Sequence, residues 1–129
     1  HAIGDACEKV AGLSHGDALS VILPHGMYHN LKFDYCRNSY EDILLALEGV
    51  DKFAETKKED RALMAVDSVV GILGDLQFLT GIPVRLSDIG VERSQFEEIV
   101  DKTMHNSALL NSAGQVKRED IESILEAAF

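Results

Sequence analysis

The sequence predicts an all-helical fold, a bundle of about six helices. Apolar residues recur at intervals of three and four along most of the chain, which is the spacing of one face of an α-helix. No segment sustains the alternation of apolar and polar residues that a half-buried strand requires. Helix-capping residues precede several periodic segments, and glycine or proline follows their ends. The length of 129 residues suits a single domain, residues 1–129, with a core of its own.

The first two helices are expected near the N-terminal end. Residues 2–10 form the first, which ends at Gly12, because glycine favours the left-handed backbone that closes many helices. Ser14 begins the second, because it can cap the helix with Asp17 three residues on. This segment is apolar nearly all round and predicts a central, buried helix. Pro24 lies inside it and should kink it, because proline has no backbone N–H.

Two further helix starts are expected in the middle of the chain. Ser39, with Asp42 three residues on, opens a third helix that stops near Gly49. Thr56 and Glu59 match a capping box, so Thr56 is predicted to begin the longest helix.

The longest helix should end at Gly81 and Pro83. Gly71 and Gly74 lie inside it, and each costs about 1 kcal/mol relative to alanine. We therefore expect them to allow close packing against a neighbouring helix.

The remaining elements are a connector and two helices. The connector covers residues 82–91, and the helices cover about 94–104 and 117–128. The residues expected to face inward are Phe96, Ile99, Val100, Ile121, Ile124 and Leu125.

Composition narrows the classes of function. The net charge of −10 disfavours binding to nucleic acids and to anionic membranes. No run is expected to reach the length of a membrane span, and no signal peptide is visible, so a cytoplasmic protein is expected. Cys7 and Cys36 do not form a C-x-x-C pair and are expected to be free thiols. Because the chain opens at His1 without a methionine, an upstream segment is also expected.

Histidines cluster at the N-terminal end, where four of the five lie within the first thirty residues. His1 and His15 begin adjacent helices, so a tight turn would bring them together, and neutral imidazoles suit Zn²⁺ or Fe²⁺. Two ligands make only half a site, so spacing alone leaves an ordinary surface role open. His25 and His29 share a helix face but lack the glutamate of H-E-x-x-H. We expect a structural His25 and an exposed His29.

The stretch from residue 1 to 30, HAIGDACEKVAGLSHGDALSVILPHGMYHN, resembles the signature of the iron-activated (group III) alcohol dehydrogenases. That signature has a ligand histidine, a second ligand histidine fourteen residues later, then Gly, Ala, an aliphatic run, Leu-Pro-His and Asn. The matching residues are His1, His15, Gly16, Ala18, Val21 to Leu23, Pro24, His25 and Asn30. Further on, Gly81-Ile82-Pro83 and Leu86-Ser87-Asp88-Ile89-Gly90-Val91 are similar to the family's G-[IL]-P and L-x-x-[IVL]-G-V loop. The resemblance thus covers nearly the whole chain.

The resemblance implies a C-terminal, metal-binding domain of an NAD(P)-linked alcohol or aldehyde oxidoreductase. In the family, a Rossmann-like N-terminal domain binds NAD(P), and one Asp and three His hold the metal. His1 and His15 would be two of those ligands, for Fe²⁺ or Zn²⁺, while the others lie on an earlier D-x-x-x-H helix. The implied partners are a small alcohol or aldehyde substrate, the missing N-terminal domain and a homo-oligomer. Residues 1–129 alone would then be inactive.

Two positions depart from the family pattern. Asp5 stands where the family usually has another histidine, four residues after the first ligand, and could act catalytically as a proton relay. An ordinary acidic residue near a helix N-terminus is the other interpretation of Asp5. Residues 111–114, Asn-Ser-Ala-Gly, replace the Asn-Pro-Arg of many members.

Two other functions stay open. Asp5 and the absent nucleotide domain are compatible with a non-enzymatic helical binding module derived from the family. Copper capture by the amino group and imidazole of a terminal His1 is a third possibility, for which the helical pattern offers no scaffold.

Overall fold

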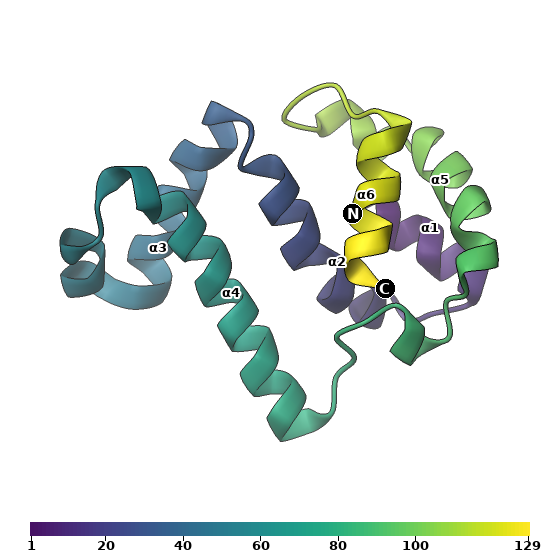
Figure 1. Ribbon diagram of the computed structural model, residues 1–129, viewed down its shortest axis with the longest axis horizontal. Coiled ribbons are helices and arrows are strands. Elements are labelled where there is room, and N and C mark those ends of the chain that lie inside the picture. The colour runs from purple at the N-terminus through teal and green to yellow at the C-terminus, as the bar shows by residue number, and fades with distance from the viewer.

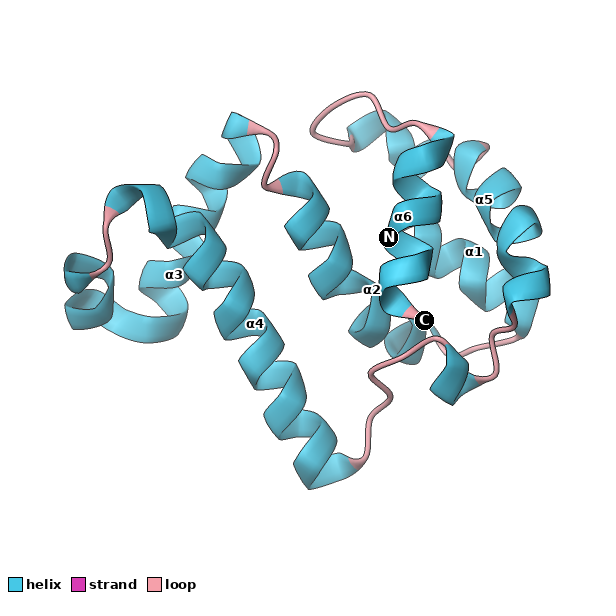
Figure 2. Ribbon diagram, viewed as in Figure 1, coloured by secondary structure: helices cyan, strands magenta, loops and turns pink.

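The fold consists of helices joined by loops (Figure 1), and it contains no strand (Figure 2). A computed structural model describes all residues from 1 to 129. The six α-helices are α1 (Ala2–Ala11), α2 (His15–Asn30), α3 (Asp34–Glu55), α4 (Lys58–Thr80), α5 (Phe96–Met104) and α6 (Arg118–Ala128). Three short 3₁₀-helices lie in the connections: η1 (Ser87–Ile89), η2 (Arg93–Gln95) and η3 (Ser107–Asn111). The all-helical prediction is confirmed.

Four helices enclose the core. In Figure 1, α1, α2, α5 and α6 gather on one side, while α3 and α4 form a long hairpin on the other. Helix α1 packs on α2 and α5, and α6 packs on the same two helices. The core is aliphatic and comprises Ala6, Cys7, Ala18, Val21, Ile22, Leu86, Val91, Ile99, Val100, Ile121, Ile124, Leu125 and Ala128. Burial of each of its large aliphatic side chains contributes about 1.5–3 kcal/mol.

The turn between α1 and α2 agrees with the prediction. Gly12 takes a left-handed backbone, with φ 69°, and donates its N–H to the Glu8 carbonyl at 2.9 Å. The Ser14 hydroxyl oxygen accepts the N–H of Asp17 at 3.1 Å. Helix α2 continues through Pro24 to Asn30. It packs on α1, α4 and α6 and is central as predicted, but it is not buried on all sides, because Val21 is buried whereas Leu23 is 48% exposed.

The predicted starts of the third and fourth helices are wrong. Ser39 lies inside α3, where its hydroxyl donates to the Tyr35 carbonyl, and the helix begins five residues earlier at Asp34. Gly49 breaks the helical path as expected, with φ 81°. Thr56 ends α3 instead of capping α4, because its hydroxyl donates to the Lys52 carbonyl at 2.7 Å. Helix α4 starts at Lys58 and, as predicted, closes at a left-handed Gly81.

The prediction that Gly71 and Gly74 allow close packing against a neighbouring helix is also wrong within residues 1–129. A Cβ atom added at either position would meet nothing within 4 Å. The second half of α4 instead presents apolar side chains to solvent, including Phe78 at 90% and Leu79 at 74% exposure. A helix that is apolar on all sides is normally covered by other protein or by lipid.

The expectation that no run reaches the length of a membrane span is corrected by α4. Its 23 residues are long and apolar enough to cross a membrane by length and composition, and 17% of its most apolar stretch is buried. A core helix of a larger protein passes the same test, so one such helix does not indicate a membrane protein.

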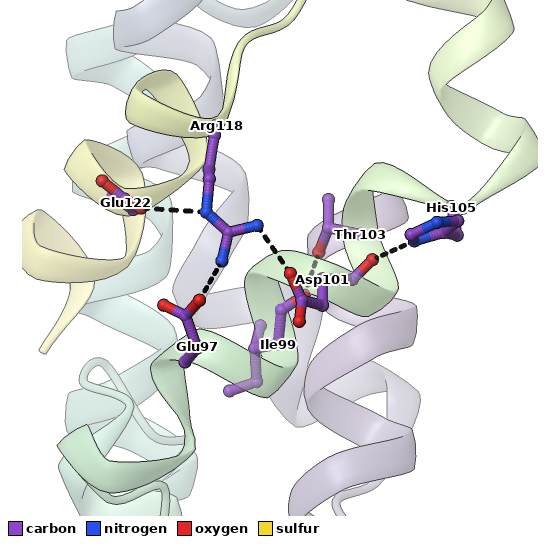
Figure 3. A network of polar contacts seen from close by, with 7 residues as sticks. All are labelled: Glu97, Ile99, Asp101, Thr103, His105, Arg118 and Glu122. Carbon is purple, nitrogen blue, oxygen red and sulfur yellow. Dashed lines mark hydrogen bonds and ion pairs between the residues drawn. The ribbon is translucent and has the colours of Figure 1, made fainter.

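Helices α5 and α6 are joined by apolar and ionic contacts. The residues predicted to face inward from them are buried, except for a half-buried Phe96. On the outer side, the Arg118 guanidinium of α6 donates to Asp101 of α5 at 2.6 Å, pairs with Glu97 and lies 3.5 Å from Glu122 (Figure 3). The bond to Asp101 raises the pKa of Arg118, so the guanidinium is a permanent charge between the two helices.

Thr103 is the one buried polar residue of the chain, and its hydroxyl donates to the Ile99 carbonyl at 2.7 Å. Helix α5 therefore buries no unsatisfied hydroxyl.

Candidate metal centre

His1 and His15 lie side by side. His1 caps the N-terminus of α1 and His15 is the first residue of α2. The turn at Gly12 reverses the chain, so the two imidazole rings stack with centroids 5.3 Å apart and planes inclined by 26°. The helices approach closely here, since a Cβ on Gly4 would lie 2.8 Å from Cδ2 of Leu19. The two residues that the sequence predicted as a pair are thus brought together.

Asp5 is the third polar group of this site. It follows His1 by one helical turn, so both side chains project from the same face of α1. Its Oδ1 atom lies 3.5 Å from Nδ1 of His15. Ligand-type atoms of His1, Asp5 and His15 all lie within 4.8 Å of one another. His1 is exposed and the other two are half-buried, so the group is open to solvent.

Glu8 orients the His15 ring. Its Oε2 atom lies 3.1 Å from Nδ1 of His15. A carboxylate only accepts hydrogen bonds, so when Nδ1 carries the proton it donates to Glu8, and the lone pair of the ring then lies on Nε2. Histidines that bind metals commonly have such a carboxylate on the opposite nitrogen.

Asn106 supports Asp5 from another part of the chain. Its Nδ2 donates to Oδ2 of Asp5 at 3.2 Å, across 101 residues of sequence. Its Oδ1 accepts the N–H of Ala108 at 2.9 Å and so caps η3. Asn106 was not predicted to belong to this site. Its capping role has a local signal, an asparagine before a turn, but its contact with Asp5 has none.

The chemistry of these residues fits a divalent transition metal. Two imidazoles and one carboxylate are ligands that both Zn²⁺ and Fe²⁺ accept. Ligands at about 2.0–2.2 Å from one tetrahedral ion lie about 3.3–3.6 Å apart, so these atoms, which lie within 4.8 Å of one another, would move closer together on binding. Asp5 and Glu8 also supply negative charge around the two imidazoles, which favours a cation at this position.

His25 and His29 are not part of this group. The expectation of an exposed His29 is wrong: its side chain is 16% exposed, and its Nε2 is buried without a hydrogen-bond partner. Asp120 Oδ1 lies 3.5 Å from that nitrogen, but the two atoms form no hydrogen bond. Burial lowers the pKa of His29, helped by the Lys32 charge and opposed by Asp120, and burial also lowers the pKa of His25.

A groove of about 700 Å³ extends from His1 along α2. Its walls come from α1, α2, η3 and α6 and are mostly apolar, with Leu19, Met27 and Leu109 among them. His29 and Tyr40 add polar atoms to the lining. The groove therefore joins His1 to a largely apolar surface.

Known proteins resemble this chain in sequence and in fold. Residues 1–129 match the sequence profile described as "Fe-containing alcohol dehydrogenase family, C-terminal". The chain is 29% identical over 132 aligned residues to the "Probable NADH-dependent butanol dehydrogenase 1" of Bacillus subtilis (strain 168), covering all of this chain and 31% of that protein. A crystal structure of a 1,3-propanediol oxidoreductase has the same fold, with a TM-score of 0.85 and 22% identity, over all of this chain and 32% of that one. The chain thus spans about a third of the length of these relatives.

Proposed function

This chain belongs to the iron-containing alcohol dehydrogenase family, whose C-terminal part it matches, and we propose that it provides His1 and His15 as ligands to a catalytic divalent metal. The whole protein would be an NAD(P)-linked oxidoreductase of small alcohols or aldehydes, acting in the cytoplasm. The observation that carries this proposal is the stacked pair of imidazoles beside Asp5, which the turn at Gly12 holds in one place.

The site chemistry follows from these side chains. When bound, Fe²⁺ or Zn²⁺ supplies Lewis-acid polarisation of the substrate oxygen, and the nicotinamide ring supplies hydride transfer. His1 and His15 serve as neutral nitrogen donors, and Glu8 keeps the His15 ring in one tautomer. Asp5 is close enough to both rings to act in the centre, either as a proton acceptor or as a ligand.

The relatives support the substrate class. One is described as an NADH-dependent butanol dehydrogenase and the other as a 1,3-propanediol oxidoreductase, both of which act on short alcohols. The groove beside His1 supports a short carbon chain at this position, because its walls are mostly apolar.

The other part of the proposed enzyme is a nucleotide-binding domain. We propose that this domain and the remaining protein cover the apolar surface of α4, which residues 1–129 leave exposed at Leu63, Val70, Ile72, Leu76, Phe78 and Leu79. A second copy of the chain is a further candidate partner for that surface. Residues 1–129, as one metal-binding domain, would have no dehydrogenase activity by themselves.

A non-enzymatic binding module is the second candidate function. Its supporting observation is Asp5, which replaces the histidine expected near the nicotinamide. A module of this kind would bind its partner equally well with or without the histidine pair.

The test is a metal-dependence assay on the full-length protein. Reduction of NAD⁺ and NADP⁺ is followed with a panel of short alcohols, after metal removal and after re-addition of Fe²⁺ or Zn²⁺. We expect activity to return with metal and to fall at least about 100-fold in His15→Ala. Glu119→Gln, an exposed change on α6, is the control. Full activity of His15→Ala, or of the metal-free protein, would refute the proposal.

A further inference from the structure

We infer that Asp5 is a third metal ligand, held in its ligating orientation by Asn106, so that residues 1–129 hold a divalent ion with their own side chains. This inference rests on the proposed metal role of His1 and His15. It assigns the carboxylate at this position a role as ligand, not as proton relay, and it gives Asn106 a positioning role.

The two oxygens of Asp5 have different surroundings. Oδ2 accepts the Asn106 amide at 3.2 Å, and Oδ1 accepts no hydrogen bond. Oδ1 is the oxygen on the histidine side, 3.5 Å from Nδ1 of His15. That nitrogen has a closer partner in Glu8, at 3.1 Å, so Oδ1 keeps its lone pairs. A half-buried carboxylate oxygen that is free of hydrogen bonds and faces two imidazoles is a ready ligand for a cation.

Asn106 can hold Asp5 in only one way. Its Oδ1 is already used by the N–H of Ala108, at 2.9 Å, so the amino group must face Asp5. If the amide were flipped, its oxygen would face the carboxylate, and two acceptors would repel each other. The backbone N–H of Asn106 donates to the Thr103 carbonyl at 2.9 Å, at the end of the buried part of α5. Asp5 is therefore connected through Asn106 to the buried Thr103 of α5.

The set of ligands explains which ions would bind. Two histidines and one carboxylate hold Fe²⁺ in many oxygenases and Zn²⁺ in many hydrolases, and they leave positions open for substrate or water. One negative ligand also offsets part of the charge of the ion, which two neutral imidazoles alone do not. Three ligands on two adjacent helices need no residue from outside the chain, so binding should not depend on another domain.

The experiment is a titration of the 129-residue chain with Co²⁺, a visible probe for Zn²⁺ and Fe²⁺ sites. Absorption reports ligand geometry, competition with a chelator gives the affinity, and far-UV circular dichroism reports helicity. The variants are Asp5→Asn, Asn106→Ser and His15→Ala, with Asp75→Asn as the control for loss of one negative charge. Serine at position 106 still caps η3 but is too short to reach Asp5, so this variant tests the contact without removing the cap.

We expect the unmodified chain and Asp75→Asn to bind Co²⁺ with the same affinity within about twofold, and His15→Ala to lose binding. Affinity should fall by more than about 100-fold in Asp5→Asn and by about 10-fold in Asn106→Ser, with a changed Co²⁺ spectrum in Asp5→Asn. If Asp5→Asn binds like Asp75→Asn, Asp5 is no ligand and the inference fails, while the proposed function stands. If the unmodified chain binds no Co²⁺, three ligands do not suffice and the inference fails. The proposed function is tested separately by metal-dependent activity of the full-length protein. If Asp5→Asn loses helicity, its lost affinity does not test the ligand role. The affinity of Asn106→Ser then tests the inference, which fails if this variant binds Co²⁺ like the unmodified chain.

Discussion

Nδ1 of His15 lies 3.1 Å from Oε2 of Glu8, one helix contacting the next across the turn at Gly12. When Nδ1 donates to Glu8, Nε2 is the ring nitrogen that a metal can bind. Glu8→Ala should therefore weaken metal affinity about 10-fold without abolishing it, whereas Glu8→Gln, which keeps an acceptor oxygen, should have a smaller effect. Chelator competition in the full-length protein measures both. Equal affinity in Glu8→Ala and the unmodified protein would show that Glu8 does not orient the ring.

The Tyr28 hydroxyl donates a 2.6 Å hydrogen bond to Asp67 and so ties α2 to α4. This bond raises the pKa of Tyr28 to about 12, with smaller contributions from burial and the Asp67 charge. A raised pKa means that the stabilisation is present below the ordinary value, near pH 10, and is lost as the pH rises toward about 12. We expect Tyr28→Phe to lower the free energy of unfolding by about 0.5–1 kcal/mol at pH 7.

Urea unfolding at pH 7 and at higher pH checks this expectation. Tyr35→Phe is the control, because Tyr35 is 75% exposed and its hydroxyl makes no hydrogen bond. The difference between Tyr28→Phe and the unmodified protein should shrink above pH 10. A constant difference at all pH values would contradict the assigned bond.

His29 should make stability depend on pH. Burial lowers its pKa below the ordinary value of about 6.5, so the unfolded chain binds the proton more readily than the folded chain. Stability from the neutral ring is therefore present above about pH 6.5 and is lost as the pH falls below it. The nearby Asp120 opposes this effect and Lys32 reinforces it.

Replacement of His29 by asparagine should flatten the pH dependence of unfolding between about pH 5 and 8. Melting temperatures across this range are the measurement, and His105→Asn, at an exposed position, is the control. If His29→Asn loses as much stability at low pH as the control does, His29 is not the group responsible.

The apolar surface of α4 should make the 129-residue chain self-associate and bind hydrophobic dyes. Phe78→Ser combined with Leu79→Ser should reduce both, with a change in unfolding free energy within about 0.5 kcal/mol, because both side chains are exposed. In contrast, Leu125→Ala, at a fully buried position, should cost about 2–5 kcal/mol. Sedimentation and dye fluorescence are the measurements. If the double variant self-associates as strongly as the unmodified chain, the surface responsible for association is not this part of α4.

The parts of the fold that depend on local contacts could be predicted from the sequence. The Ser14 cap and the stop at Gly12 involve residues three or four apart, and both agree with the structure. Thr56 shows where local patterns fail. Its spacing to Glu59 suits a helix start, but its hydroxyl also reaches the carbonyl of Lys52, and that contact ends the preceding helix.

The site was predictable only in part. His1 and His15 follow from a signature along α1 and α2, but the bond from Asn106 to Asp5 spans 101 residues and depends on how α5 packs on α1. The burial of His29 likewise depends on α6, which a helix-face pattern on α2 does not contain. Gly71 and Gly74 suggested a closely packed neighbouring helix, but no atom of residues 1–129 lies within 4 Å of a Cβ added at either position.

The most direct test of the metal centre is a crystal of the protein grown with Zn²⁺ or Co²⁺, with diffraction data collected at the absorption edge of the metal. We expect one strong anomalous peak at bonding distance from His1 and His15, with Oδ1 of Asp5 coordinated as well. A peak at bonding distance from the histidines alone would support the proposed metal role of His1 and His15 and would show that Asp5 is not a ligand. A peak elsewhere, or none, in a crystal where both imidazoles are ordered would contradict the central claim.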